Sequence, residues 1–309
     1  MKAANATGIL PSVLNLIGNT PLVQLQRLPS PGSANLLVKL EYLNPGGSVK
    51  DRIALAMIEA AEAQGLLKPG GTIVEPTGGN TGIALALVGA AKGYQVILTT
   101  PEGLGLERRT LLGLFGAQLV LTPMAEGMAG AVKAAEGLVA QNPDYFMPRQ
   151  FENPHNPEAH RRTTAQEILR ATGGRVDAFV AGIGTGGTIT GVGEVLKEKN
   201  PRVLVVGVEP AYSPVLSGSG PGKHTIQGLG PNFVPKVLNR GILDRVIPVR
   251  DEDAYETQGR LIREEGLLAG VSSGANVFAA LQVANELGTG KTVVTLLPDT
   301  GERYLTFVP

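Results

Sequence analysis

The stretch Asn44-Pro45-Gly46-Gly47-Ser48-Val49-Lys50-Asp51-Arg52 joins an apolar run at residues 36–40 to a helical pattern at residues 53–63. Ser48 is a favourable N-cap residue, which predicts that Lys50 lies in the first turn of the helix. The positive end of the helix dipole disfavours an ammonium group, so we expect a larger neutral fraction for this amine. A neutral lysine can attack a carbonyl and form an imine, although most lysines at helix starts are simply solvated.

Around this turn, short strand-like runs alternate with helical patterns along the whole chain. Such alternation predicts an α/β fold with parallel strands, helices on both sheet faces, and ligands bound beyond the carboxyl ends of the strands. A polar, proline-rich segment at residues 150–157 interrupts the pattern, which predicts two modules, 1–150 and 151–309. The expected strands are residues 72–74, 95–98, 118–121, 178–181, 203–208, 245–249 and 292–297, and the expected helices start at 82, 106, 128, 159, 189, 254 and 275.

The composition excludes several function classes. Lys plus Arg (27) balances Asp plus Glu (27), and with 4% aromatic residues and no Trp we expect no nucleic-acid partner. The absence of Cys fits a cytoplasmic protein and excludes thiolate sites. The three histidines are scattered, so we expect surface or capping roles for His155 and His160 and assign no metal. No signal-peptide pattern opens the chain, and the longest apolar run, residues 83–91, is far below the roughly 20 residues of a membrane span.

A glycine-rich loop follows the expected strand at residues 178–181. The segment Gly182-Ile183-Gly184-Thr185-Gly186-Gly187-Thr188 should point several backbone N–H groups and a helix dipole at one anion. Its glycines satisfy G-x-G-x-x-G, and Glu209 follows the next strand, as a dinucleotide site requires. The hydroxyls of Thr185 and Thr188 favour a compact monophosphate instead. The loop alone leaves both alternatives open.

Two further loops precede helical patterns. The segment Glu75-Pro76-Thr77-Gly78-Gly79-Asn80-Thr81-Gly82 offers backbone N–H groups and neutral side-chain donors, which suit a carboxylate, although an ordinary capped turn also explains it. Ser272 and Ser273 precede the helix expected at residues 275–287, where one of them could act as its cap. Residues 210–235 form a long loop rich in Gly and Pro, which is typical of a functional or mobile segment.

Nine motifs together resemble the pyridoxal-phosphate enzymes of the tryptophan synthase β-chain group, and within it the cysteine synthase (O-acetylserine sulfhydrylase) family. The resemblance runs nearly end to end and is far more specific than any single glycine motif. The motifs are Ile17-Gly18-Asn19-Thr20-Pro21-Leu22, the Lys50 turn, the Asn80 loop, Leu106-Glu107-Arg108-Arg109, Gln150-Phe151, Gly184-Thr185-Gly186-Gly187-Thr188, Ser213-Pro214-Val215-Leu216-Ser217-Gly218, Ile226-Gln227-Gly228-Leu229-Gly230 and Gly301-Glu302-Arg303-Tyr304-Leu305.

The resemblance implies the fold type II architecture, with two doubly wound open-sheet domains and an active site in the cleft between them. Residues up to about 40 can cross to the second domain. It also implies that Lys50 forms a Schiff base with pyridoxal 5'-phosphate. The other implied cofactor contacts are Asn80 with the ring hydroxyl, Ser272 with the pyridine nitrogen, and Gly184, Thr185, Gly186, Gly187 and Thr188 with the phosphate. The implied substrate contacts are Thr77, Gly78, Gly79, Thr81, Gln150 and Gly228.

The implied reaction is a β-replacement that converts O-acetylserine and sulfide into cysteine and acetate, with Lys50 also serving as general base and acid. A near alternative is a cystathionine β-synthase reaction with homocysteine. Outside the family, the alternatives are a nicotinamide-dependent oxidoreductase and a non-catalytic binding module. The resemblance further implies a cytoplasmic homodimer and a serine acetyltransferase partner whose tail docks in the active site.

Two positions depart from the family pattern, because Gly78 and Gly105 stand where serine is usual. At Gly78, beside the expected substrate carboxylate, only a backbone N–H remains. We therefore expect weak substrate binding that Gly78→Ser would tighten. The alternative is that Gly78 leaves room that a side chain would fill, in which case the substitution would weaken binding.

Overall fold

The computed structural model describes residues 8–307, and these divide into two compact units. The first contains Asn44–His155 together with the chain up to Ile17. The second contains Gly18–Leu43 together with the chain from Asn156 onward. The Lys50 turn and the Asn80 loop therefore belong to the first unit, and the glycine-rich loop at residues 182–188 belongs to the second.

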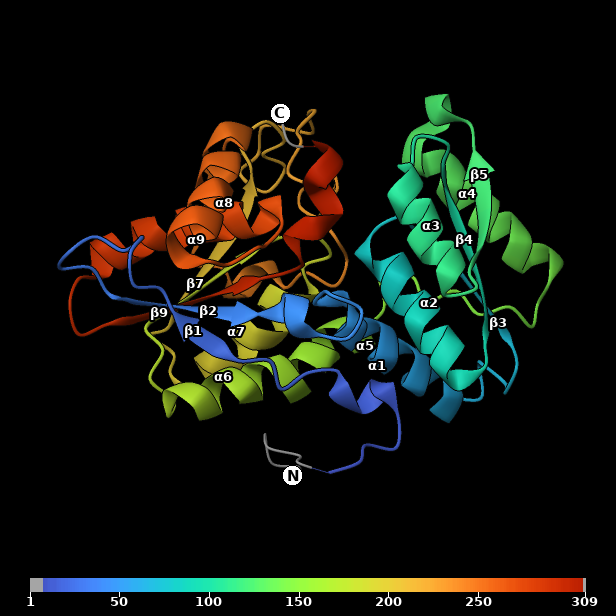
Figure 1. The fold of residues 1–309 in the computed structure, drawn as a ribbon, viewed down its shortest axis with the longest axis horizontal. Helices are drawn as coiled ribbons and strands as arrows, with labels where there is room; N and C mark the ends of the chain where they lie inside the picture. Colours follow the sequence, from blue (N-terminus) through green and yellow to red (C-terminus); the bar gives the residue numbers. More distant parts are fainter. Residues whose placement is uncertain (1–7, 308–309) are drawn as a thin grey trace. The chain divides into compact units, whose positions relative to one another are not determined.

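The first unit is built on a three-stranded parallel sheet in the order β3-β4-β5 (Figure 1). Alternate strand residues face opposite sides, as a two-residue period requires. Ile73 and Leu98 pack with α1, α2 and α3, whereas Val74 and Ile97 pack with α4. The elements are α1 (Lys50–Ala63), β3 (Thr72–Pro76), α2 (Asn80–Lys92), β4 (Gln95–Pro101), α3 (Leu106–Leu114), β5 (Gln118–Thr122) and α4 (Gly127–Gln141), with 3-10 turns η1 (Val13–Leu16) and η3 (Met124–Glu126).

The second unit is built on a six-stranded sheet in the order β1-β2-β9-β6-β7-β8. All neighbours are parallel except β1, which pairs antiparallel with β2 at the edge. The strands are β1 (Leu22–Gln24), β2 (Asn35–Leu40), β6 (Ala178–Gly182), β7 (Leu204–Pro210), β8 (Arg245–Val249) and β9 (Thr292–Leu297). β1 was not predicted, because three residues are too short to show an alternating pattern.

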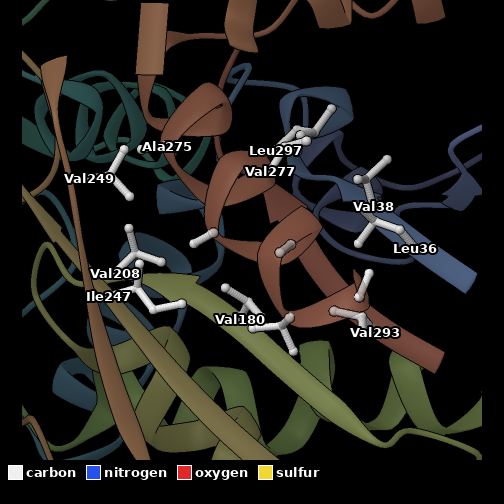
Figure 2. Packing of buried hydrophobic residues seen from close by; sticks show 14 of the residues in the cluster. Leu36, Val38, Val180, Val208, Ile247, Val249, Ala275, Val277, Val293 and Leu297 are labelled. Atoms are coloured by element: carbon white, nitrogen blue, oxygen red, sulfur yellow. The ribbon is translucent and has the colours of Figure 1, made fainter. Parts of the chain in front are cut away.

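Helices cover both faces of this sheet. On one face α9 lies across the strands, and Figure 2 shows its Ala275 near Val249 and its Val277 near Leu297, in the same buried cluster as Val180 and Val293. On the other face a second core packs α6 and α7 against Phe179 and Val294. The elements are α5 (His155–Ala159), the π-helical η4 (His160–Thr164), α6 (Ala165–Thr172), α7 (Gly187–Lys199), α8 (Asp251–Glu265) and α9 (Val271–Leu287), with 3-10 turns η2 (Glu41–Leu43), η5 (Arg240–Ile242) and η6 (Gly301–Phe307).

The predicted α/β class with parallel sheets is confirmed, and two helices depart furthest from their predicted bounds. The helix expected at residues 159–171 is interrupted by the π-helical turn η4, and α9 starts at Val271 instead of residue 275. Within residues 8–307, none of the helices combines the length and the apolar character that a membrane span requires.

Candidate functional site

The turn before Lys50 uses its two glycines for different reasons. Gly47 has a positive φ of 75°, and its N–H closes the turn onto the Asn44 carbonyl at 2.8 Å. Gly46 lies against the carboxylate of Asp51, so an added Cβ would stand only 2.5 Å from an Asp51 oxygen. The same carboxylate accepts the Gly46 N–H at 2.6 Å. These contacts fix the chain just before and after Lys50.

Lys50 is the first residue of α1 and is half-buried. The N-cap residue is Val49 and not the expected Ser48. The Ser48 hydroxyl still accepts the Lys50 N–H at 3.2 Å and so satisfies one of the backbone groups that a helix start leaves without a partner. The predicted position of this lysine at the positive end of a helix is confirmed. The influence of the helix dipole on its side-chain amine stays a prediction.

The Asn80 loop connects β3 to α2 without a side-chain cap. The N-cap residue of α2 is Gly79, which has no side chain to accept the first N–H groups of the helix. Thr77 Oγ1 accepts the Gly79 N–H at 3.3 Å and so shapes the loop. The ordinary capped turn that the sequence also allowed is thus not what the structure contains. Backbone donors at this helix start suit a carboxylate.

Gln150 joins this loop from a distant part of the chain. Its side-chain oxygen accepts a hydrogen bond of 2.6 Å from the Thr81 hydroxyl, and both groups are buried. The structure thus brings together Thr77, Gly78, Gly79, Thr81 and Gln150, five residues that the sequence analysis assigned to substrate binding.

Sequence reasoning missed Glu75, a carboxylate that is 1% exposed at the end of β3. Its two oxygens accept the N–H groups of Arg149 and Gln150, each at 2.9 Å. Arg149 has a φ of 56°, a left-handed conformation that is unfavourable for a side chain of this size. Burial raises the pKa of Glu75 to about 7, although the two backbone hydrogen bonds favour the charged form. Glu75 therefore holds the segment that presents Gln150.

The glycine-rich loop of the second unit is shaped by close contacts. Gly186 is the N-cap residue of α7, with a φ of 84°. A Cβ on Gly184 would stand 2.3 Å from the carbonyl oxygen of Gly228, and a Cβ on Gly187 would stand 1.8 Å from Asn156 Oδ1. Backbone N–H groups at a helix start, in a space that side chains would fill, form an anion-binding cradle. Gly228, an expected substrate contact, lies against this cradle.

The two threonines of the cradle are held by buried side chains that sequence reasoning missed. Asn156 Nδ2 donates to Thr185 Oγ1 at 3.0 Å, and His160 Nε2 lies 3.2 Å from Thr188 Oγ1. The expected surface or capping role of His160 is wrong, because this side chain is 1% exposed and its Nδ1 lies 2.9 Å from Thr164 Oγ1. The π-helical turn that carries His160 points its ring at the cradle, a placement that scattered histidines in the sequence do not indicate.

Ser272 is the second residue of α9 and is 3% exposed. It does not cap the helix, because the N-cap residue is Gly270 and no side chain makes a capping bond. Within residues 8–307 the Ser272 hydroxyl has no hydrogen-bond partner. A hydroxyl of a nearly buried residue that makes no hydrogen bond to the described residues is suited to a bound ligand. One turn later, Asn276 lies 2.8 Å from where a Cβ on Gly182 would be, so α9 reaches the start of the cradle.

Glu209 decides against the dinucleotide alternative. Its carboxylate is 2% exposed and accepts the N–H groups of Leu216 and Ser217 at 2.8 and 3.0 Å, and it also bonds the Ser217 hydroxyl. These bonds occupy the carboxylate that a nicotinamide dinucleotide site would direct to a ribose. Glu209 instead anchors the start of the long loop that follows β7.

The comparisons with known proteins agree with this geometry. A family model described as pyridoxal-phosphate dependent enzyme matches residues 13–299. The chain belongs to this family. The cysteine synthase of Staphylococcus aureus is 56% identical over 295 residues, which is 95% of each chain.

Solved structures give the same result. The crystal structure of O-ureido-L-serine synthase has a TM-score of 0.94 and 47% identity, and the match covers 97% of this chain and 94% of that one. The cysteine synthase of Entamoeba histolytica has a TM-score of 0.94 and 41% identity, with 99% and 92% covered. The chain is thus a pyridoxal-phosphate dependent enzyme with the fold of the family, and the nicotinamide alternative is set aside.

The residues present fit this cofactor. The cradle at the start of α7 has the backbone donors and threonine hydroxyls that a phosphate requires. The unpartnered Ser272 hydroxyl can hydrogen-bond a pyridine nitrogen without charging it. Lys50 is an amine at the positive end of a helix.

Proposed function

We propose that this enzyme makes cysteine and acetate from O-acetylserine and sulfide. The observation that carries the proposal is a loop suited to a carboxylate in a chain 56% identical to the cysteine synthase of Staphylococcus aureus. An amino-acid substrate presents such a carboxylate. The Thr81–Gln150 bond of 2.6 Å provides a preformed polar wall beside that loop.

In this proposal each half of the chain supplies part of the residues that bind the cofactor and the substrate. Residues 1–150 supply Lys50, which holds the cofactor, and the loop from Thr77 to Thr81, which holds the substrate carboxylate; Asn80 bonds the ring hydroxyl. Residues 151–309 supply the phosphate cradle, Gly228 beside the substrate, and Ser272 at the pyridine nitrogen. When bound, pyridoxal phosphate supplies the electron sink that makes the Cα proton of an amino acid acidic.

The amine of Lys50 then removes the Cα proton and later returns it, as general base and general acid. Its position at the start of α1 favours the neutral form that a base requires. Ser272 donates a neutral hydrogen bond, whereas an aspartate would keep the ring nitrogen protonated. This milder arrangement favours loss of the β-substituent over longer-lived carbanion chemistry. We further propose a cytoplasmic homodimer and a complex with serine acetyltransferase.

The test is a product assay with purified protein loaded with pyridoxal phosphate. O-acetylserine is offered with either sulfide or homocysteine, and the products are separated by chromatography. We expect cysteine with sulfide and little cystathionine with homocysteine. Cystathionine as the main product would replace the proposal with the cystathionine β-synthase alternative, and turnover of neither pair would refute both.

A further inference from the structure

Thr100 lies at the carboxyl end of β4, beside the Asn80 loop. The register pairs Pro76 of β3 with Thr99 of β4, so Thr100 stands level with the start of the loop that follows β3. Its side chain is 3% exposed. Within the described part of the chain its hydroxyl makes no hydrogen bond. A hydroxyl that belongs to a nearly buried residue and makes no hydrogen bond within the protein is available to a ligand.

The Thr100 hydroxyl lies in the space that a side chain at residue 78 would fill. A Cβ on Gly78 would stand 2.6 Å from Thr100 Oγ1 and 2.9 Å from Leu104 Cδ1. Both distances are shorter than a carbon tolerates, so a side chain at residue 78 would displace its neighbours. The glycine therefore leaves the space in which the Thr100 hydroxyl lies. The expectation that Gly78→Ser would tighten substrate binding is opposed by this geometry.

We propose that Thr100 is a substrate-binding residue, whose hydroxyl donates a hydrogen bond to the substrate carboxylate in place of a side chain at residue 78. The loop around Gly78 carries the backbone donors of the same site, and Thr100 adds the hydroxyl from the neighbouring strand. The inference rests on the proposed function, because it takes the loop to hold an amino-acid carboxylate. In this inference Gly78 leaves the space for the carboxylate, and Thr100 supplies the hydroxyl that binds it.

The test measures binding of L-alanine, which has the carboxylate but no β-leaving group, to the cofactor-loaded enzyme by isothermal titration calorimetry. Thr100→Val keeps the shape and removes the hydroxyl. Since a hydrogen bond to a charged group is lost, we expect Kd to rise about tenfold or more, with unchanged cofactor content. Thr122→Val is the matched control, because Thr122 is another buried threonine whose hydroxyl has no partner among the described residues, one strand further on. It should bind L-alanine as the parent does.

The pairing is tested separately. Gly78→Ser should weaken binding of L-alanine, and adding Thr100→Ala should recover part of the loss by freeing the space. Parent-like affinity in Thr100→Val, or tighter binding in Gly78→Ser, would overturn the inference while the product assay still supported the proposed function. If the parent enzyme bound no L-alanine and formed no cysteine, the proposed function would fail and this inference with it.

Discussion

At the scale of single residues, Glu75 shows how a charge outside the reacting groups can organise a site. It is a buried carboxylate that accepts hydrogen bonds from the backbone N–H groups of Arg149 and Gln150. Burial is the largest influence and raises the pKa of Glu75 to about 7, from 4.5. Between these pH values the native protein binds a proton that the unfolded chain does not. The stability that this proton gives is present below pH 4.5 and is lost as pH rises through 7.

We therefore predict that Glu75→Gln removes part of the pH dependence of stability. A shift of this size corresponds to on the order of 3 kcal/mol of unfolding free energy between pH 4.5 and 7.5. Urea unfolding at both pH values measures it, with Glu59→Gln, an exposed glutamate on α1, as the control. If Glu75→Gln showed the same change with pH as the parent, Glu75 would not titrate as described.

A site residue could be predicted where its position depends on the neighbouring sequence, and not where it depends on contacts with distant elements. Lys50 and Gly186 follow from helix starts and turns, which the sequence displays directly. Glu75, Thr100 and His160 act through partners on other elements, so no local pattern indicates them. For Glu75 the sequence did contain one signal, because a glutamate lies inside the apolar run of β3. A charged side chain is seldom buried unless it has a partner.

At the scale of elements, the phosphate cradle is best tested through the backbone at the start of α7. Gly187→Ala would place a methyl group 1.8 Å from Asn156 Oδ1. We expect Asn156 to be displaced, its bond to Thr185 to be lost, and cofactor retention after dialysis to fall several-fold. Gly137→Ala in α4 is the matched control, since an added Cβ there meets nothing within 4 Å and alanine favours a helix. Full retention of pyridoxal phosphate by Gly187→Ala would contradict this description of the cradle.

The elements themselves were predicted best where the periodicity is long. β8 and β9 match their predicted bounds, and α7 and α8 start two and three residues before their predicted starts. The pattern at residues 159–171 is typical of one helix, and a single π-helical turn inside it has no local sequence signal. Contacts of His160 with Thr164 and Thr188 accompany this interruption, and those contacts lie outside any local sequence signal.

At the scale of the whole molecule, the family follows from motifs spread over the chain more than from any one of them. The glycine-rich loop alone left a dinucleotide as a serious alternative. Glu209 excludes it only once its bonds to Leu216 and Ser217 are seen. The strands β1 and β2 lie early in the sequence yet belong to the second unit, through the parallel pairing of β2 with β9. The division of functional roles between residues 1–150 and 151–309 stays a prediction.

The central claim is that Lys50 holds the cofactor, and covalent mapping tests it most directly. Purified enzyme loaded with pyridoxal phosphate is reduced with borohydride, digested, and analysed by mass spectrometry. We predict that the reduced cofactor is attached to the peptide containing Lys50, and that Lys50→Ala gives a folded protein with neither label nor turnover. Attachment to a different lysine, or normal turnover in Lys50→Ala, would contradict the account.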